Sequence, residues 1–323
     1  MKFFKILIFL LSFQAASFAQ RISKADQKIL SQKEDSLKIQ AYKIIEGINA
    51  ADRFKADSIF TKTFVRALAT KNSFYHPFDS LITISRIYAP DSTFRIFTWQ
   101  MVVNENIIRQ HGAIQLRMAD GSLKLFPLID KSDITQNMED TVGNNFGWMG
   151  AVYYNIILTK NQDHKYYTLL GFDENNIRSN KKVIEVLDFV NGQPVFGGHF
   201  FRIPNGNLVA HNPARYIMEY KKESAAKLNY DDEMGMIIVE HLVSETKEPQ
   251  KKWTYITDGD FEGFKWIEGK WVFIDNVRNY KTRDPNVPLE KTIRDEKGDI
   301  DYDKLKSTEN EPASIPKPIK KKD

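Results

Sequence analysis

The sequence predicts a mainly β protein of the α+β class, in which an antiparallel β-meander forms a sandwich or partly closed barrel after an N-terminal helical pair. The main observation is a series of short segments rich in Val, Ile, Phe, Tyr and Trp between residues 80 and 277, separated by turn residues. Such frequent punctuation is typical of antiparallel hairpins rather than of βαβ units. Helical apolar periodicity before residue 72 and several Xaa-Gly turn pairs complete the prediction.

The segment 22–71 is predicted to form two helices that pack against each other and onto the β domain. Apolar residues recur at three- and four-residue steps in two stripes, Leu37, Ala41, Ile44, Ile45 and Ile48, and then Ala56, Phe60, Phe64 and Leu68. This spacing places each stripe on one helix face. We expect a break at 47–52, with Asp52 capping the second helix.

Thirteen segments are predicted to be strands. They cover 82–88, 94–103, 112–119, 122–129, 150–159, 165–172, 182–190, 195–201, 214–221, 236–243, 253–257, 263–267 and 270–276. The stretches between them contain residues that favour turns, such as Gly, Pro, Asn, Asp and Ser.

Asp120-Gly121 is a favoured two-residue hairpin turn, because both central positions need positive φ. This turn pairs Met118 with Leu123, Leu116 with Leu125, and Ile114 with Pro127. All six side chains then share one face, and a one-residue slip would mix the two faces. The pattern therefore predicts this register.

Two further turn pairs predict hairpins. A turn at Glu268-Gly269 places Trp266 opposite Trp271 and Phe264 opposite Phe273, which forms an aromatic cross-strand cluster. Asn191-Gly192 marks the other hairpin, although Pro194 close behind favours an edge strand or an irregular loop.

The N-terminus has the pattern of a removable secretion signal. Lys2 and Lys5 precede an apolar run over 6–13, and Ser17-Phe18-Ala19 provides small residues before a cleavage site near Ala19. An uncleaved anchor is the alternative, but the run is shorter than the about 20 apolar residues that a spanning helix needs. We expect a periplasmic or secreted protein with no transmembrane span in its mature chain.

Composition excludes several classes of function. The absence of cysteine excludes disulfides, thiolate metal sites and cysteine nucleophiles. The formal charge is +4, and because Lys2 and Lys5 belong to the signal, the mature chain carries about +2 with acids and bases interleaved. A balanced distribution of this kind argues against a nucleic-acid partner, which requires a concentrated basic face.

Four parts of the chain are expected: a signal peptide at 1–19, a helical N-terminal segment at 20–79, an antiparallel β domain at 80–280 and a flexible charged tail at 281–323. The tail is mostly charged residues and proline, and it ends in Lys320-Lys321-Lys322. Such a segment buries too little apolar area to offset the entropy of ordering it.

The candidates for ligand binding are His199, His211 and Trp148. His199 and His211 flank a glycine-containing loop and are the nearest approach to a metal-ligand pair, but they lack the third ligand of a zinc centre. We therefore expect no metal and no cofactor. Trp148, in the loop after Asn144, is the best sugar-stacking candidate if it is exposed; buried core is the alternative for it and the other tryptophans.

The candidates for catalysis are Glu262 and Asp275. The Glu268-Gly269 hairpin register places these carboxylates opposite each other, where they could share a proton or flank a glycosidic bond. The alternative is a solvated hairpin end. The nearby run Asp258-Gly259-Asp260 departs from the EF-hand calcium spacing. Neither a Gly-x-Ser-x-Gly elbow nor a glycine-rich phosphate loop is present.

The stretches 94–99, 167–173, 195–197 and 263–266 resemble sequences of uncharacterised exported bacterial β-rich proteins. No activity is known for that family, so the resemblance implies export and a β-rich fold only.

We expect a non-catalytic binding or assembly protein of the cell envelope, with an envelope or extracellular ligand such as a carbohydrate or a protein. The alternative is a hydrolase that acts on a polysaccharide or another envelope polymer with paired carboxylates. A cleft with converging acids would favour the enzyme, and a filled sandwich with scattered polar groups would favour the binding protein.

Overall fold

The computed structural model describes residues 22–104, 106–205 and 208–277. The predicted signal peptide at 1–19 and the charged tail at 281–323 lie outside these residues. No helix in the described ranges has both the length and the apolar character needed to cross a membrane. The protein is mainly β, as predicted, and its strands form three separate sheets rather than a barrel.

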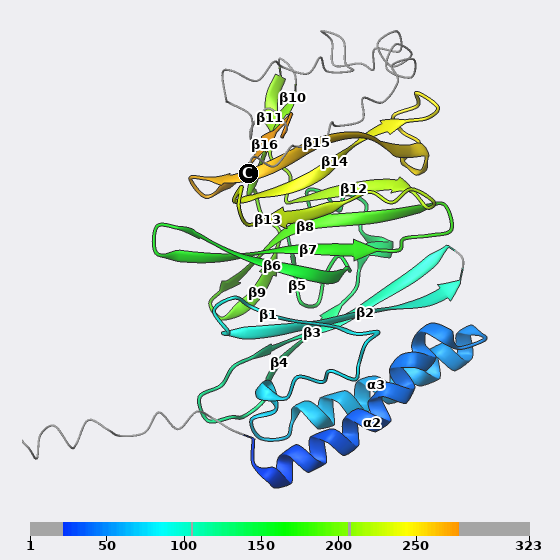
Figure 1. Cartoon of the computed structure of the whole chain (residues 1–323), viewed down its shortest axis with the longest axis vertical. Coiled ribbons are helices and arrows are strands. Elements are labelled where there is room, and N and C mark those ends of the chain that lie inside the picture. Colours follow the sequence, from blue (N-terminus) through cyan, green and yellow to red (C-terminus); the bar gives the residue numbers. More distant parts are fainter. Residues whose placement is uncertain (1–21, 105, 206–207, 278–323) are drawn as a thin grey trace, which may run out of the picture. The chain divides into compact units, whose positions relative to one another are not determined.

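The helical pair precedes the first sheet (Figure 1). It consists of α2 (Lys24–Glu46) and α3 (Ala50–Leu68). A short 3₁₀ turn, η1 (Ser73–Tyr75), leads into the first sheet, whose order is β1-β2-β3-β4. Its strands are β1 (Ser85–Tyr88), β2 (Phe94–Asn104), β3 (Ile107–Leu116) and β4 (Lys124–Ile129).

The middle sheet has the order β5-β9-β8-β7-β6. Strand β9 pairs with residues 187–190 of β8, and β12 pairs with residues 179–185 of the same strand. Its strands are β5 (Gly143–Asn144), β6 (Val152–Asn161), β7 (His164–Asp173), β8 (Ser179–Val190), β9 (Gln193–Phe196) and β12 (Arg215–Lys221). A second 3₁₀ turn, η2 (Ser132–Ile134), lies between β4 and β5.

The third sheet has the order β11-β10-β16-β15-β14-β13. Its strands are β10 (Phe201–Asn205), β11 (Leu208–His211), β13 (Leu228–Asp231), β14 (Met236–Ser244), β15 (Tyr255–Ile267) and β16 (Lys270–Ile274). The 3₁₀ turn η3 (Lys252–Thr254) comes directly before β15. The pairing of β10 with β16 is parallel, which the prediction of antiparallel structure missed.

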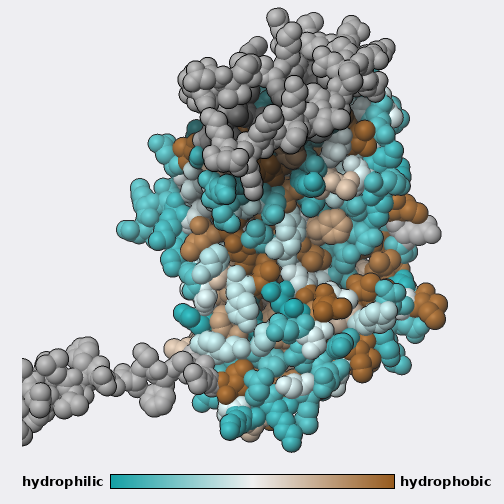
Figure 2. Space-filling model, viewed as in Figure 1, coloured by the Kyte–Doolittle hydropathy of each residue, from teal (hydrophilic) through white to brown (hydrophobic). Residues whose placement is uncertain are grey.

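Three hydrophobic cores join these elements into four layers. The first lies between the helices and the first sheet and contains Phe60, Phe64 and Phe97. The second lies between the first and middle sheets, and the third between the middle and third sheets. Successive strand residues point to opposite faces, so Ile96 enters the second core while its neighbour Phe97 enters the first. Figure 2 shows brown apolar residues interspersed with teal ones on the visible face of the described part.

Local capping sets the start of each helix. The Ser23 side chain accepts a hydrogen bond from the Asp26 amide at the start of α2, and the Asn49 side chain accepts one from the Asp52 amide at the start of α3. The predicted cap at Asp52 is therefore wrong by three residues. Asp52 lies in the first turn instead, where its negative charge interacts favourably with the positive end of the helix dipole.

A buried arginine connects β2 to the η1 segment. The Arg95 guanidinium, with no exposed surface, donates hydrogen bonds to the Ser73 and His76 carbonyls and to the Gln115 side chain. It also lies 4.6 Å from the centre of the Phe97 ring. Burial lowers the pKa of Arg95 to about 10, which still leaves it charged at neutral pH.

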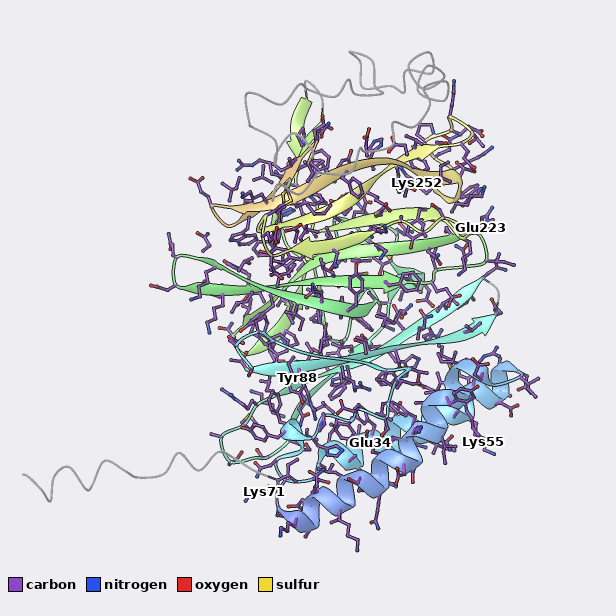
Figure 3. The ribbon with its side chains drawn as sticks, in the orientation of Figure 1. Glu34, Lys55, Lys71, Tyr88, Glu223 and Lys252 are labelled. Carbon is purple, nitrogen blue, oxygen red and sulfur yellow. The ribbon has the colours of Figure 1, made fainter. Side chains whose placement is uncertain are left out.

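His76 extends this connection to the helices. Its Nε2 atom lies 2.6 Å from Oε2 of Glu34 on α2, which Figure 3 labels, and both side chains are buried. The second carboxylate oxygen of Glu34 accepts a hydrogen bond from the Ser80 amide. Polar contacts as well as the apolar stripe therefore fix α2 against the first sheet.

The β3–β4 hairpin has a different register from the predicted one. Leu116 pairs with Lys124, and Ile114 pairs with Phe126, one position away from the expected partners. The prediction assumed that only one face of the hairpin is buried. Apolar side chains of β4 instead enter cores on both faces, since Leu125 packs toward the helices and Phe126 enters the second core, so either register buries apolar side chains.

The other two predicted hairpins are confirmed. Trp266 pairs with Trp271 and Phe264 with Phe273, and Glu268 and Gly269 both have positive φ. Val190 pairs with Gln193 around Asn191-Gly192, which have positive φ as well. The first of these hairpins was predictable because aromatic residues pair across its strands. The second was predictable because Asn and Gly both adopt positive φ readily at the two turn positions.

The core between the helices and the first sheet allows a direct test. Phe97→Ala removes a side chain with no exposed surface that packs edge-on against Phe64. We expect it to lower the free energy of unfolding by about 3–4 kcal/mol, because it leaves a cavity. The matched control Phe146→Ala, at a side chain that is 64% exposed, should change it by less than about 0.5 kcal/mol. Urea unfolding measures both, and equal losses would contradict the packing described.

An ionic contact also joins the first and middle sheets. Oδ2 of Asp91, in the β1–β2 turn, accepts hydrogen bonds from Lys165 Nζ at 2.8 Å and from Tyr167 OH at 3.0 Å, both on β7. Burial raises the pKa of Asp91, but these bonds and those from Thr93 outweigh it and lower the pKa to about 2.

Asp91→Asn should therefore reduce stability in a pH-dependent way. A carboxyl group whose pKa is lowered on folding stabilises the protein above its unfolded pKa, and this stabilisation disappears as the pH falls from about 4 to about 2. We expect a loss of about 1–2 kcal/mol at pH 7 that narrows toward zero across that interval. Urea unfolding at pH 7 and pH 2.5 measures it. Asp35→Asn, exposed on α2, is the control, and a gap that is independent of pH would contradict this account.

Candidate functional site

Trp148, the predicted sugar-stacking residue, is a core residue. Its side chain has no exposed surface, and its Nε1 donates a hydrogen bond to Tyr153 OH at 2.7 Å. Tyr153 OH donates in turn to Glu185, whose other oxygen accepts from Arg215 Nε at 3.1 Å. The condition for sugar binding by Trp148, exposure of the ring, is therefore not met. The same loop exposes Phe146 instead.

His199 and His211 have separate partners in the fold. His199 Nδ1 is 2.8 Å from the Asn212 carbonyl, and His211 Nε2 is 3.7 Å from Oδ1 of Asp140. Across the described residues, no group of three or more His, Asp or Glu side chains has the geometry of a metal centre.

The predicted carboxylate pair lies at the end of the β15–β16 hairpin. The last paired residues are Gly263 and Ile274, one position before Glu262 and Asp275, and Asp275 is exposed. Glu262 lines a pocket whose lining does not include Asp275.

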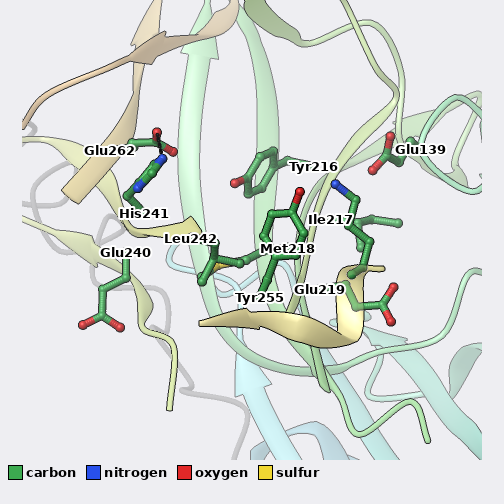
Figure 4. Close-up of a pocket in the computed structure, with 11 residues that line it drawn as sticks. Glu139, Tyr216, Ile217, Met218, Glu219, Glu240, His241, Leu242, Tyr255 and Glu262 are labelled. Atoms are coloured by element: carbon green, nitrogen blue, oxygen red, sulfur yellow. Dashed lines mark ion pairs between the residues drawn. The ribbon is translucent and has the colours of Figure 1, made fainter. Parts of the chain in front are cut away.

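The pocket that Glu262 lines lies between the middle and third sheets and has a volume of about 310 Å³ (Figure 4). This is at the lower end of the range for small-molecule sites. Strand β12 contributes Tyr216 and Glu219, strand β14 contributes Glu240 and His241, and η3 contributes Lys252. Tyr255 and Glu139 also line it.

A β-bulge sets the position of His241. The β14–β15 register pairs Glu240 with Phe261 and Leu242 with Thr257, so Asp258-Gly259-Asp260 lie opposite His241 alone. Gly259 has φ +86°, a conformation that glycine adopts without a Cβ penalty. Bulges redirect side chains in this way, and this one places Asp258 Oδ2 2.8 Å from His241 Nδ1. The acidic run that resembles a calcium loop in sequence is thus a bulge that holds a histidine.

The other side of the His241 ring faces Glu262. Nε2 of His241 lies 3.5 Å from Oε1 of Glu262, so the imidazole stands between two carboxylates. Both side chains are largely buried, at 16% exposure each. With one ring nitrogen bonded to Asp258 and the other facing Glu262, the ring is held in one orientation at the pocket wall.

Tyr216 lines the pocket near two of its carboxylates. In Figure 4 its ring lies between Glu262 and His241 on one side and Glu139 on the other. Burial raises the pKa of Tyr216, and the negative charges of Glu262 and Glu139 raise it further. Within the described residues its hydroxyl forms no hydrogen bond, while its ring packs against Phe264 with centroids 4.9 Å apart. A neutral hydroxyl is therefore available to a ligand in a negative environment.

The remaining carboxylates have neutral hydrogen-bond partners. Glu219 accepts from the Ser179 hydroxyl at 2.5 Å, and Glu240 accepts from the Lys227 amide at 2.6 Å. Among the described residues, Glu139, Glu219 and Glu240 form no ion pair with Lys or Arg. The pocket therefore combines four glutamates with one lysine, Lys252, whose Nζ lies 4.6 Å from the centre of the Tyr255 ring.

Sequence reasoning found one member of this pocket, Glu262, and missed His241, Tyr216 and Glu139. The alternation on β12 and β14 predicted strands there but not which sheets face each other. The one available signal was Asp258-Gly259-Asp260, because a glycine flanked by acids inside a strand pattern indicates a bulge.

Comparisons of the chain with family models, with curated proteins and with solved structures find no match. The ligand that suits the pocket is therefore inferred from the residues that line it.

Proposed function

We propose that this protein is an exported, non-catalytic binding protein of the cell envelope, and that its pocket between β12 and β14–β15 binds a small organic cation. The observation that carries the proposal is the charge of the pocket wall, which has four glutamates and a single lysine. A partly enclosed site with an excess of one sign of charge concentrates ligands of the opposite sign.

The aromatic residues of the pocket support the same ligand class. A cation over the face of a tyrosine ring is attracted by the ring quadrupole, typically by about 0.5–1 kcal/mol at exposed sites. Lys252 over Tyr255 is such a contact inside the pocket. The Tyr216 hydroxyl adds a neutral hydrogen-bonding group that can orient a ligand.

The arrangement of His241 favours binding over hydrolysis. A general base needs a nitrogen that can accept a proton from the attacking group, but both nitrogens of His241 face carboxylates of the protein itself. Among the described residues that line the pocket, none is a serine, threonine or cysteine. The carboxylate-pair hydrolase also loses support, because Asp275 lies outside the pocket.

Export is part of the proposal and is supported by the sequence alone. The basic residues, the apolar run and the small residues before Gln20 form the three parts of a secretion signal. The resemblance of the β domain to exported bacterial proteins agrees with this location.

Calorimetry with a charged and a neutral ligand of equal length tests the proposal. We expect the protein to bind 1,4-diaminobutane at low ionic strength and not 1,4-butanediol, and we expect added salt to weaken the binding. Glu139→Gln/Glu262→Gln should reduce the affinity about tenfold, since two partly exposed charge contacts contribute about 0.7 kcal/mol each. Glu46→Gln is the control: it makes one such substitution on α2, away from the pocket, and should leave the affinity unchanged.

Three results would contradict a cation site. They are absence of diamine binding, equal binding of the diol, and unchanged affinity in the double variant. Binding of a neutral disaccharide such as cellobiose that the double variant retains would instead support a carbohydrate ligand. Circular dichroism of each variant establishes that the fold is intact.

A further inference from the structure

The lysine that lines the pocket has no anionic partner in the described part of the chain, although four glutamates line the same pocket. Lys252 lies on η3, and among the described residues its ammonium group forms no ion pair, while its Nζ stands over the Tyr255 ring. The protein therefore places one of its own cations, on the exposed Lys252 side chain, over an aromatic face in the lining of the pocket. An alkylammonium ligand could contact the face of the Tyr255 ring only by displacing the Lys252 ammonium group.

Glutamate side chains lie on either side of Tyr216, another residue that lines the pocket (Figure 4). Glu262 and Glu139 both act on Tyr216, where they add to the effect of burial in raising the pKa of its hydroxyl. Neither carboxylate lies within ion-pair distance of Lys252. The pocket thus has two separate positions for positive charge, one over Tyr255 and one beside Tyr216.

We propose that the pocket recognises an aliphatic diammonium ligand, and that Lys252 is an internal competitor for one of its two charged ends. This inference rests on the proposed function, because it specifies the cation that the site takes. One ammonium group binds beside Glu139 and Glu262 and donates to the Tyr216 hydroxyl. The other displaces the Lys252 ammonium from the Tyr255 ring and takes its place.

The competition makes Lys252 a specificity-determining residue. A monoammonium ligand gains the contacts of the acidic wall but has no second charge to exchange for Lys252. A diammonium ligand makes both contacts, and the displaced lysine side chain regains its freedom in solvent. Selectivity for two charges over one follows from the difference between these two cases.

Binding measurements on Lys252→Met test the competition. We expect this variant to bind 1,4-diaminobutane at least threefold more tightly than the unmodified protein, because the aromatic position no longer has to be vacated. Lys160→Met, which removes the same charge from the exposed β6 end, should change the affinity by less than twofold. In Lys252→Met/Tyr255→Leu the gain should be lost, since the displaced position no longer offers an aromatic face.

The unmodified protein should also discriminate between ligands of one and two charges. We expect n-butylamine to bind at least tenfold more weakly than 1,4-diaminobutane. In NMR spectra, the Hε resonances of Lys252 should be shifted upfield by the Tyr255 ring in the free protein. The diamine should move them toward the values of a solvated lysine, and butylamine should leave them in place.

The outcomes separate this inference from the function on which it rests. Equal affinities for the two amines, or Lys252 resonances that do not respond to the diamine, would overturn the competition while cation binding stands. A gain in Lys252→Met that persists without Tyr255 would show a general effect of charge and would also overturn it. Failure of every amine to bind the unmodified protein and Lys252→Met would overturn both proposals.

Discussion

The burial of both faces of the first and middle sheets is the constraint on which the rest of the structure depends. Each sheet lies between two other layers, and strands such as β2, β7 and β8 supply apolar side chains in both directions. Strand β2 meets this demand with Phe94 and Ile96 on one face and Phe97 and Trp99 on the other. Without disulfides, these three cores are the main source of stability in the described part of the chain.

A sheet buried on both faces must also satisfy its polar groups without water. Arg95 does so with backbone carbonyls and surrounding rings, and Glu185 with Arg215 and Tyr153. Loss of one partner in such a group leaves the other unpaired in the interior, which costs more than the bond contributes. These residues therefore specify how the layers meet as well as how tightly they pack.

The candidate site lies where this close packing is interrupted. Between the middle and third sheets, the bulge at Asp258-Gly259-Asp260 and the turn η3 hold the walls apart, and polar side chains replace the apolar ones. Glu219 accepts a hydrogen bond from a hydroxyl and Glu240 accepts one from a backbone amide, in contrast to Glu185 of the interior, which pairs with Arg215. Acidic side chains that line one pocket repel one another, and a cationic ligand of the proposed kind would offset that repulsion.

The sequence by itself determined the class of fold, the helical pair and the two hairpins whose turns carry Asn-Gly and Glu-Gly, because these features depend on periodicity and on residues near one another in the chain. It did not determine the β3–β4 register, since alternation fixes a register only when one face is exposed to solvent. Only the tertiary structure buried Trp148 and brought Glu262 to His241 and Tyr216. Those relations depend on which sheet faces which, and contacts between layers leave no local pattern along the chain.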